Sequence, residues 1–321
     1  MAKTPAIVKE IQQSTPPEVN YAYQKNISYS QYTMWKKCPK QWALQYRDGH
    51  KIYTPSIHTV FGKALHEAFQ HYIKVMYETS AAAANREDIN KIFKDQFETH
   101  FINEHKKAKE ITTNYKKSDV NEFLKDGFEI LNHLKKNRGK YFSKRGWHLV
   151  GIETPILIPP MKYNPNVLFM GFLDIVMYNE NEKQFKIIDI KTSTNGWNDY
   201  AKKDEEKQFQ LILYKKFFAE QFEVDIEDID IEFFITRRKV YEDGDYPQKR
   251  FQILGKHEIP SGKIKTNRAI KAIEKFMSEC FVKNEYSTKE MIPNPSKWNC
   301  NFCPYSYKGK GKKFCGKGAS F

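Results

Sequence analysis

The spacing of apolar residues predicts a helical first half of the chain. Between residues 58 and 78, apolar side chains recur every three or four positions, which is the spacing of one buried helix face. Two more amphipathic stretches follow, around residues 89–101 and 120–134. Each is long enough for a helix of three turns or more, so helices are expected to dominate this part of the fold.

The pattern changes near Trp147, where it begins to predict a sheet. The segments WHLVGIETPILI, VLFMGFLDIVMY and QFKIIDIKT are rich in β-branched and aromatic residues, and NENE joins the last two as a hairpin turn. A helix is expected at about 204–221, strands around 229–238 and 250–259, and a helix over 261–282. This order predicts an α/β or α+β fold of the kind that enzymes use, and excludes a repeat array.

Composition narrows the class of protein. The 321 residues carry 53 Lys and Arg against 39 Asp and Glu, a formal charge of +14. Such a surplus favours a polyanionic partner, because Lys and Arg neutralise phosphates. With 40% hydrophobic and 15% aromatic residues the chain is not disordered. No apolar run approaches the ~20 residues of a membrane span, and the first 20 residues lack a secretory h-region. We therefore expect a soluble cytoplasmic protein with no membrane contact.

Two carboxylates and a lysine are expected to meet on one face of the hairpin. If the strands fold back symmetrically about NENE, Asp174 lies opposite Ile187, and Ile187 shares its face with Asp189 because side chains alternate. The two carboxylates are then diagonal neighbours about 7–8 Å apart between backbones. Lys191 points the same way.

Both aspartates lie inside apolar runs, where a charge is usually paired or bound to metal. A pair of converging carboxylates is a hard oxygen site that suits Mg²⁺ or Mn²⁺. A neighbouring lysine is able to position a water or offset phosphate charge. The alternative interpretation is a solvated hairpin face with an ordinary ion pair.

The five cysteines indicate a metal centre rather than disulfides. Three of them form C-x₂-C-x₁₁-C near the end of the chain, at Cys300, Cys303 and Cys315. Cys280 lies inside an amphipathic helix, where a buried thiol is ordinary. Cys38 is the better fourth ligand, because it ends a short helix capped by serine and precedes Pro39. Four thiolates suit either [4Fe–4S] or Zn²⁺.

The ordered set of motifs resembles the PD-(D/E)XK nuclease superfamily, and within it the RecB-like exonuclease branch that includes the iron–sulfur CRISPR-associated nucleases. GKALH (62–66) is similar to the family's histidine motif, GFLD (171–174) to its aspartate motif, IIDIKTS (187–193) to its D/E-x-K motif and QLILY (210–214) to its Q-x-x-x-Y motif. Each motif alone is weak, whereas their order and spacing together are specific.

The resemblance implies a restriction-endonuclease-like αβββαβ core and a role for each motif residue. The divalent metal would be held by His66, Asp174, Asp189 and the backbone carbonyl of Ile190, and Lys191 would orient or activate the attacking water. Gln210 and Tyr214 share one helix face and would contact the metal site or the DNA strand. Glu153 would support the metal site through water. Taken from the residues alone, a single histidine such as His66 on an amphipathic helix is more often a core histidine, and Glu153 is as readily an edge-strand surface charge.

The resemblance also implies the domain organisation and the cofactors. We expect a flexible arm over 1–27, a helical region over 28–146, a nuclease core over 147–290 and a cluster-bearing tail over 291–321 that packs with Cys38. The early cysteine would join the three late ones around a structural [4Fe–4S] cluster, with Zn²⁺ as the alternative.

The function expected from these features is a metal-dependent DNA nuclease. Exonuclease action on single strands or duplex ends fits best, because no base-reading module is visible in the sequence and RecB-like relatives mostly act on ends. Recombination, repair or replication would be the setting, with the proteins of those processes as partners. The alternatives are a catalytically inactive nucleic-acid-binding protein on the same scaffold, and an interaction protein built around a zinc-binding tail.

Overall fold

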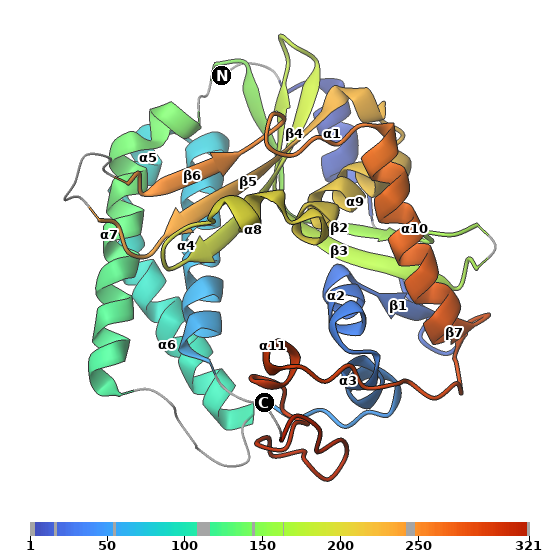
Figure 1. The fold of residues 1–321 in the computed structure, drawn as a ribbon. Coiled ribbons are helices and arrows are strands. Elements are labelled where there is room, and N and C mark those ends of the chain that lie inside the picture. The colour runs from blue at the N-terminus through green and yellow to red at the C-terminus, as the bar shows by residue number, and fades with distance from the viewer. Residues whose placement is uncertain are drawn as a thin grey trace. The chain divides into compact units, whose positions relative to one another are not determined.

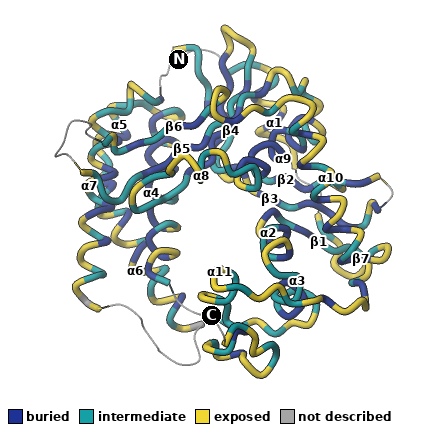
Figure 2. Tube along the Cα trace, viewed as in Figure 1, coloured by how far each residue is buried: buried dark blue, intermediate teal, exposed yellow. Residues whose placement is uncertain are grey.

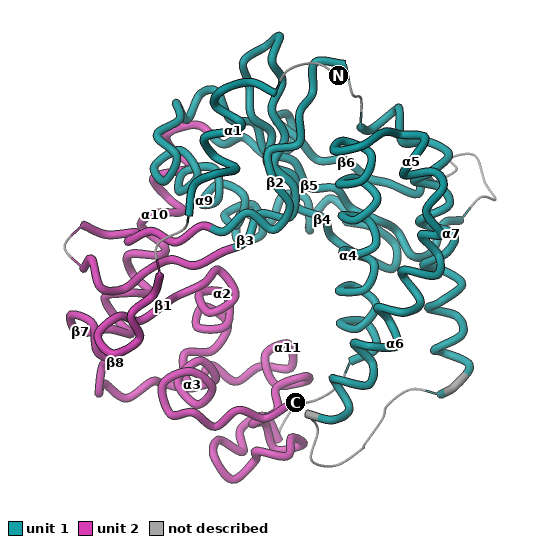
Figure 3. The backbone as a smooth tube through the Cα atoms, turned by 180° about the vertical axis from the view of Figure 1, so that it is seen from behind, with its two compact units in different colours: residues 1–15, 55–155, 172–261 teal, residues 16–54, 156–171, 262–321 magenta. Residues whose placement is uncertain are grey.

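The chain forms two compact units, each assembled from segments that are separate in sequence (Figure 3). A computed structural model describes residues 4–15, 18–53, 56–107, 116–142, 145–162, 164–241 and 248–319. Unit 1 contains residues 1–15, 55–155 and 172–261, and unit 2 contains residues 16–54, 156–171 and 262–321. All the candidate metal-site residues belong to unit 1 and all four candidate cluster cysteines to unit 2, so each site is described within its own unit.

Unit 1 contains a layer of long helices. The sequence spacing predicted three of them, and they pack side by side as α4, α6 and α7 (Figure 1). Their bounds, with those of the shorter α1 and α5, are α1 Ala6–Gln13, α4 Ile57–Glu78, α5 Ala81–Arg86, α6 Ile89–Lys107 and α7 Lys117–Tyr141.

The sheet of unit 1 has the strand order β3-β4-β5-β6, with β2 paired to β3. Strands β3 and β4 are antiparallel, β4 and β5 parallel, and β5 and β6 antiparallel. From α4 onward the principal elements follow the expected order α-β-β-β-α-β. Their bounds are β2 Trp147–Ile158, β3 Val167–Asn179, β4 Gln184–Ser193, α8 Asp199–Lys203, α9 Glu205–Gln221, β5 Ile229–Arg237 and β6 Phe251–Leu254.

Strands β4 and β5 are largely buried, because helices cover both faces of this sheet (Figure 2). On one face the α4 layer packs through Phe69, whose ring lies 5.3 Å from that of Phe234. On the other face α9 packs through Phe218, 5.5 Å from the ring of Phe185. Because neighbouring residues of a strand point to opposite faces, Asp189 faces the α9 side whereas Ile188 and Ile190 belong to the core under α4.

The hairpin register differs from the expected one by two residues. Ile175 lies opposite Ile188 and Asn179 opposite Gln184, so Asp174 is in line with Asp189 rather than with Ile187. The loop is longer than a tight turn because the Asn179 side chain accepts the N–H groups of residues 181 and 182, and residue 183 takes a left-handed φ of 54°. A shift of two preserves side-chain parity, so both carboxylates still share a face.

Two other expectations change. Of the predicted arm, residues 1–3 and 16–17 lie outside the described residues, but residues 6–13 form α1, which buries Val8 and Ile11. The strand expected at 250–259 ends as β6 at Leu254, because the Glu258 carboxylate accepts the N–H of Gly255 and turns the chain.

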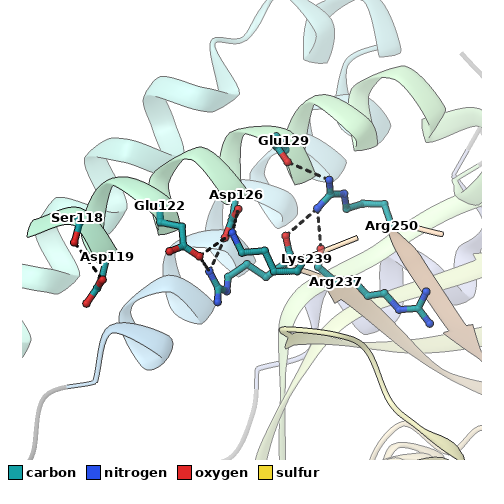
Figure 4. Close-up of polar contacts among 9 residues, drawn as sticks. Ser118, Asp119, Glu122, Asp126, Glu129, Arg237, Lys239 and Arg250 are labelled. Carbon is teal, nitrogen blue, oxygen red and sulfur yellow. Dashed lines mark hydrogen bonds and ion pairs between the residues drawn. The ribbon is translucent and has the colours of Figure 1, made fainter. Parts of the chain in front are cut away.

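A network of ion pairs joins α7 to the segment between β5 and β6 within unit 1 (Figure 4). Asp126 contacts Arg238 at 2.6 Å and Lys239 at 2.9 Å. One turn away on the helix, Glu129 contacts Arg250 at 3.1 Å. The network therefore holds the helical layer to the edge of the sheet.

Unit 2 is built around aromatic rings. Trp42 and Phe276, from opposite ends of the sequence, meet edge to face at 5.6 Å. Ser28 caps the helix Tyr29–Lys37, as expected, by accepting the N–H of Gln31. The short strand β1 pairs in parallel with Val167–Phe169 at the start of β3. The bounds are β1 Lys25–Ile27, α2 Tyr29–Lys37, α3 Pro39–Trp42 continuing as a π-helix over Ala43–Arg47, α10 Lys263–Cys280, β7 Phe281–Val282, β8 Glu285–Tyr286 and α11 Lys297–Cys300.

None of the helices in the described part of the chain combines the length and the apolar character that a membrane span needs.

Candidate active site

The two aspartates and the lysine meet where the pairing of β3 and β4 ends. Lys191 Nζ lies 2.7 Å from Asp189 Oδ2, as expected for residues two apart on one strand face. Beyond the last β3–β4 pair, Asp174 Oδ2 accepts the backbone N–H of Ile190 at 2.6 Å. The strand ends therefore bring an acidic pair and one cation together.

Burial makes this acidic pair costly to ionise without a cation. Burial and the neighbouring charge of Asp189 raise the pKa of Asp174 well above its usual value, against the pull of Lys191. Burial likewise raises the pKa of Asp189, and the ion pair with Lys191 opposes the shift. A divalent cation would offset the repulsion between the carboxylates that a single lysine leaves uncompensated.

Helix α4 brings His66 to the same place. His66 Nδ1 lies 3.7 Å from Asp174 Oδ2, and burial together with the charge of Lys191 lowers the pKa of His66 to about 4. The imidazole is therefore neutral at physiological pH, the form that ligates metals. Gly62, one turn earlier, allows the approach: a Cβ there would lie 3.3 Å from Thr192 Oγ1 on β4.

Glu153 is joined to the site by Gln70, a residue that the sequence analysis missed. The buried Gln70 Nε2 donates to Glu153 Oε1 at 2.6 Å and to the backbone carbonyl of Asp174 at 3.1 Å. Glu153 interrupts the regular course of β2 with a left-handed φ of 50°. A signal was present in the sequence, because Gln70 is a polar residue one turn after His66 on a helix face that is otherwise buried.

Gln210 and Tyr214 bring α9 to the acidic pair. Gln210 Nε2 donates to the Tyr214 hydroxyl at 3.3 Å, as their four-residue spacing allows. Burial, then the charge of Asp189, raises the pKa of Tyr214, with smaller contributions from Asp174 and Glu153. Tyr214 therefore stays a neutral phenol within electrostatic range of three carboxylates.

The donor set suits a hard divalent cation, although the side chains as placed are not closed around one. Within the described residues, no three His, Cys, Asp or Glu side chains are already gathered closely enough to hold a metal ion. The chemistry still fits, since two buried carboxylates with raised pKa values lie at the neighbouring ends of β3 and β4, and a neutral imidazole from α4 lies 3.7 Å from one of them.

The four candidate cluster cysteines all lie within unit 2, and in the described part of the chain no three of them are already close enough to hold a metal ion. All five cysteines are free thiols. Burial raises the pKa of Cys303, and the thiols of Cys38, Cys300 and Cys315 raise it further, so the four lie within electrostatic range of one another. The backbone N–H of Asn294 donates to Cys38 Sγ at 3.4 Å.

Two features hold the tail in this place. Asn294 and Asn299 both donate to the carbonyl of Lys37, at 3.1 and 3.0 Å, and tie the tail to the end of α2. The His50 ring stacks on that of Phe314 at 3.9 Å. Unit 2 therefore brings the sequence-distant Cys38 to the late cysteines without a covalent bond.

Comparison with known proteins identifies the family. The sequence model of the PD-(D/E)XK nuclease superfamily matches residues 26–307, so the chain belongs to that superfamily. Its fold is accordingly the restriction-endonuclease-like α/β fold, and its class that of the nucleases. Among solved structures, the chain is similar to a "Putative exonuclease" from Eubacterium rectale, with a TM-score of 0.42 and 12% identity over 83% of this chain and 85% of that one. A search of the curated proteins gave no match.

Replacing Gln70 is expected to weaken the site without removing a charge. In Gln70→Leu, Glu153 and the carbonyl of Asp174 lose their shared donor, so we expect cleavage to fall about 10- to 100-fold and more Mg²⁺ to be needed for half-maximal rate. Magnesium titrations of the cleavage rate measure both effects. The matched control is Gln221→Leu, whose glutamine donates to the backbone of β2 at Pro155. Equal loss in the two variants would show that Gln70 has no special link to the site.

Proposed function

We propose that this protein is a divalent-metal-dependent deoxyribonuclease that acts on single strands or duplex ends. The observation that carries the proposal is the meeting of Asp174, Asp189, Lys191 and neutral His66 at the end of the β3–β4 pairing. An isolated ion pair on a hairpin does not require a buried second carboxylate or a histidine from another layer. Membership of a nuclease superfamily supports the assignment of phosphodiester cleavage to these residues.

In this proposal each residue has a separate task. Asp174, Asp189, His66 and the carbonyl of Ile190 hold Mg²⁺ or Mn²⁺, which when bound polarises the phosphate and offsets the charge that develops on it. Lys191 is partly exposed, so its ammonium is able to reach a water or a phosphate oxygen while Asp189 holds it in place. Glu153, positioned by Gln70, supports the site from β2. From α9, Gln210 and Tyr214 contact the DNA strand.

The choice of DNA ends rests on charge and on the resemblance to the RecB-like branch. A formal charge of +14 favours a polyanion and binds it without regard to base sequence. Recombination, repair or replication, with proteins of those processes as partners, is the proposed setting because ends arise there.

The deciding experiment is a time course on DNA that is radiolabelled at one end. Single-stranded and duplex substrates are incubated with Mg²⁺, Mn²⁺ or chelator. We expect metal-dependent shortening, with the released products showing whether single nucleotides or longer fragments leave. Binding without cleavage under every metal condition would favour the catalytically inactive alternative. Rapid cutting of closed circular DNA would contradict the preference for ends.

We further propose that Cys38, Cys300, Cys303 and Cys315 hold a structural [4Fe–4S] cluster, with Zn²⁺ as the alternative. The donor set fits, because four thiols lie within electrostatic range and the N–H of Asn294 already donates to one sulfur. One distant cysteine with three clustered ones favours the cluster over a zinc ribbon, which uses two local pairs. Its task would be to join α2 to the tail.

Removing one cluster cysteine is expected to cost metal and stability together. Cys303→Ser, purified without oxygen, should lack the brown colour and iron of the wild type and unfold at a lower temperature, because metal binding energy adds to folding energy. Metal analysis and thermal melts measure the two effects. Cys280→Ala is the control, since Cys280 is buried in α10. A colourless wild type with one zinc per chain would identify Zn²⁺ instead.

A further inference from the structure

A polar pocket lies beyond the end of β4, in unit 1 and separate from the metal-site residues. Its volume is about 700 Å³, within the range of small-molecule and nucleotide sites. Ser193 at the end of β4 and the loop that follows, residues 194–198, form one wall, and Lys207 of α9 and Arg237 of β5 contribute to the others. The loop thus continues directly from the strand that carries Asp189 and Lys191.

The wall formed by this loop is fixed in place. Gln252 of β6 binds the backbone of Trp197 twice, accepting from its N–H at 2.8 Å and donating to its carbonyl at 3.0 Å. Gly196 has a φ of 81°, and a Cβ there would lie 2.3 Å from Arg237 Nε. Only glycine therefore allows both the turn and the close approach of the arginine. These contacts hold the wall of the pocket in a fixed position.

The pocket has the charge and the aromatic surface of a nucleotide site. Among the described residues that line it, Lys207 and Arg237 are cationic and none is acidic. Lys207 Nζ lies 5.2 Å from the centroid of the Trp197 ring, and it pairs at 3.8 Å with the partly exposed carboxylate of Asp204. Figure 4 shows the Arg237 guanidinium pointing away from the carboxylates of α7. It donates to the carbonyl of Lys249 at 2.9 Å. Cations beside an aromatic ring suit a phosphate joined to a base.

One buried ring links this pocket to the candidate active site. Phe233 lies beside Asp189 in the sheet. Its ring centroid is 5.9 Å from Lys191 Nζ and 4.9 Å from the Trp197 ring. The reactive ammonium and the indole are therefore no more than about 11 Å apart, a span of roughly three nucleotides at about 3.4 Å of rise per nucleotide.

We propose that this pocket binds a nucleotide of the substrate strand two or three positions from the bond that is cut, with Lys207 and Arg237 on its phosphate and Trp197 against its base. The proposal rests on the nuclease function proposed above and adds a subsite that holds the strand in register. A strand that enters both places presents its backbone to Lys191 in one orientation. Strands too short to reach the pocket lose that guidance.

The test compares Lys207→Gln with Lys216→Gln, which removes the same charge from the opposite side of α9, where Lys216 pairs with Glu220. Binding of fluorescent single-stranded oligonucleotides is measured in chelator, so that no cleavage is needed. We expect Lys207→Gln to weaken binding about 3- to 5-fold at 0.1 M salt and to reduce the salt slope by about one, with the control unchanged. In the cleavage assay, KM should rise while kcat changes less than about twofold.

Two further measurements separate the possible failures. Trp197→Phe keeps an aromatic ring packed on Phe233. We expect this variant to lack the quenching of tryptophan fluorescence that an oligonucleotide causes in the wild type. Dinucleotides should not distinguish Lys207→Gln from wild type. If the wild type cleaves DNA and both variants bind and cut like the control, the subsite is refuted while the nuclease stands. If a free nucleoside monophosphate binds as tightly as a long strand, and Lys207→Gln weakens both equally, the pocket serves free nucleotides and the strand proposal is wrong.

Discussion

Asp174→Asn is expected to abolish cleavage, lowering kcat by at least about 10³-fold, while the protein stays folded. The amide oxygen of asparagine is able to accept the same N–H of Ile190 that Asp174 accepts at 2.6 Å, so the local backbone contact survives. What is lost is the negative charge next to Asp189 and His66 on which the metal would depend. Single-turnover cleavage with saturating Mg²⁺ measures the loss.

The same variant separates a metal site from a structural ion pair by thermal melting. In chelator, the burial and repulsion that raise the pKa of Asp174 make its carboxylate a cost to folding, so Asp174→Asn should be as stable as wild type or more so. When Mg²⁺ is added, wild type should gain stability by binding it, whereas the variant should not.

The control for both measurements is Asp228→Asn, which removes a carboxylate at an exposed position before β5. It should cleave and melt like wild type with and without metal. A folded Asp174→Asn enzyme that cuts at the wild-type rate would show that the catalytic carboxylates lie elsewhere.

Side-chain alternation explains why the sequence placed the acidic pair correctly despite an incorrect register. Parity along a strand decides the face, and any even shift leaves Asp174 and Asp189 together. The exact register depended on the loop, where the Asn179 side chain binds two backbone N–H groups. Such local bonds leave little trace in hydrophobic periodicity.

Contacts between elements distant in sequence were harder to predict. The polar Gln70 stood out on a buried helix face, but its partners come from 83 and 104 residues further along the chain. Helix α1 escaped prediction because its eight residues are fewer than the window of about 11–18 over which a helical period is recognised. The pocket beyond β4 likewise combines a loop, a helix and a strand whose meeting only the fold defines.

The ion-pair network on α7 is the clearest case, since Asp126 and its partners are separated by 112 and 113 residues. Asp126 is 5% exposed and binds both Arg238 and Lys239, and the guanidinium of Arg238 also lies 4.1 Å above the Phe123 ring. Among the described residues, removing the shared carboxylate leaves this largely buried arginine with the exposed Glu122 as its remaining ion-pair partner. An uncompensated buried charge costs more than the pair contributes.

Asp126→Ala is therefore expected to lower the free energy of unfolding by about 2–4 kcal/mol, seen as a lower urea midpoint by circular dichroism. Glu129→Ala is the matched control: it removes the same charge from the same helix, but Glu129 is 45% exposed, so its pair with Arg250 should contribute no more than about 1 kcal/mol. Cleavage per folded molecule should not change in either variant, because neither residue contacts the acidic pair. Equal destabilisation would mean that burial of Asp126 gives it no special weight, and that apolar packing rather than the ion pairs holds α7 to the sheet.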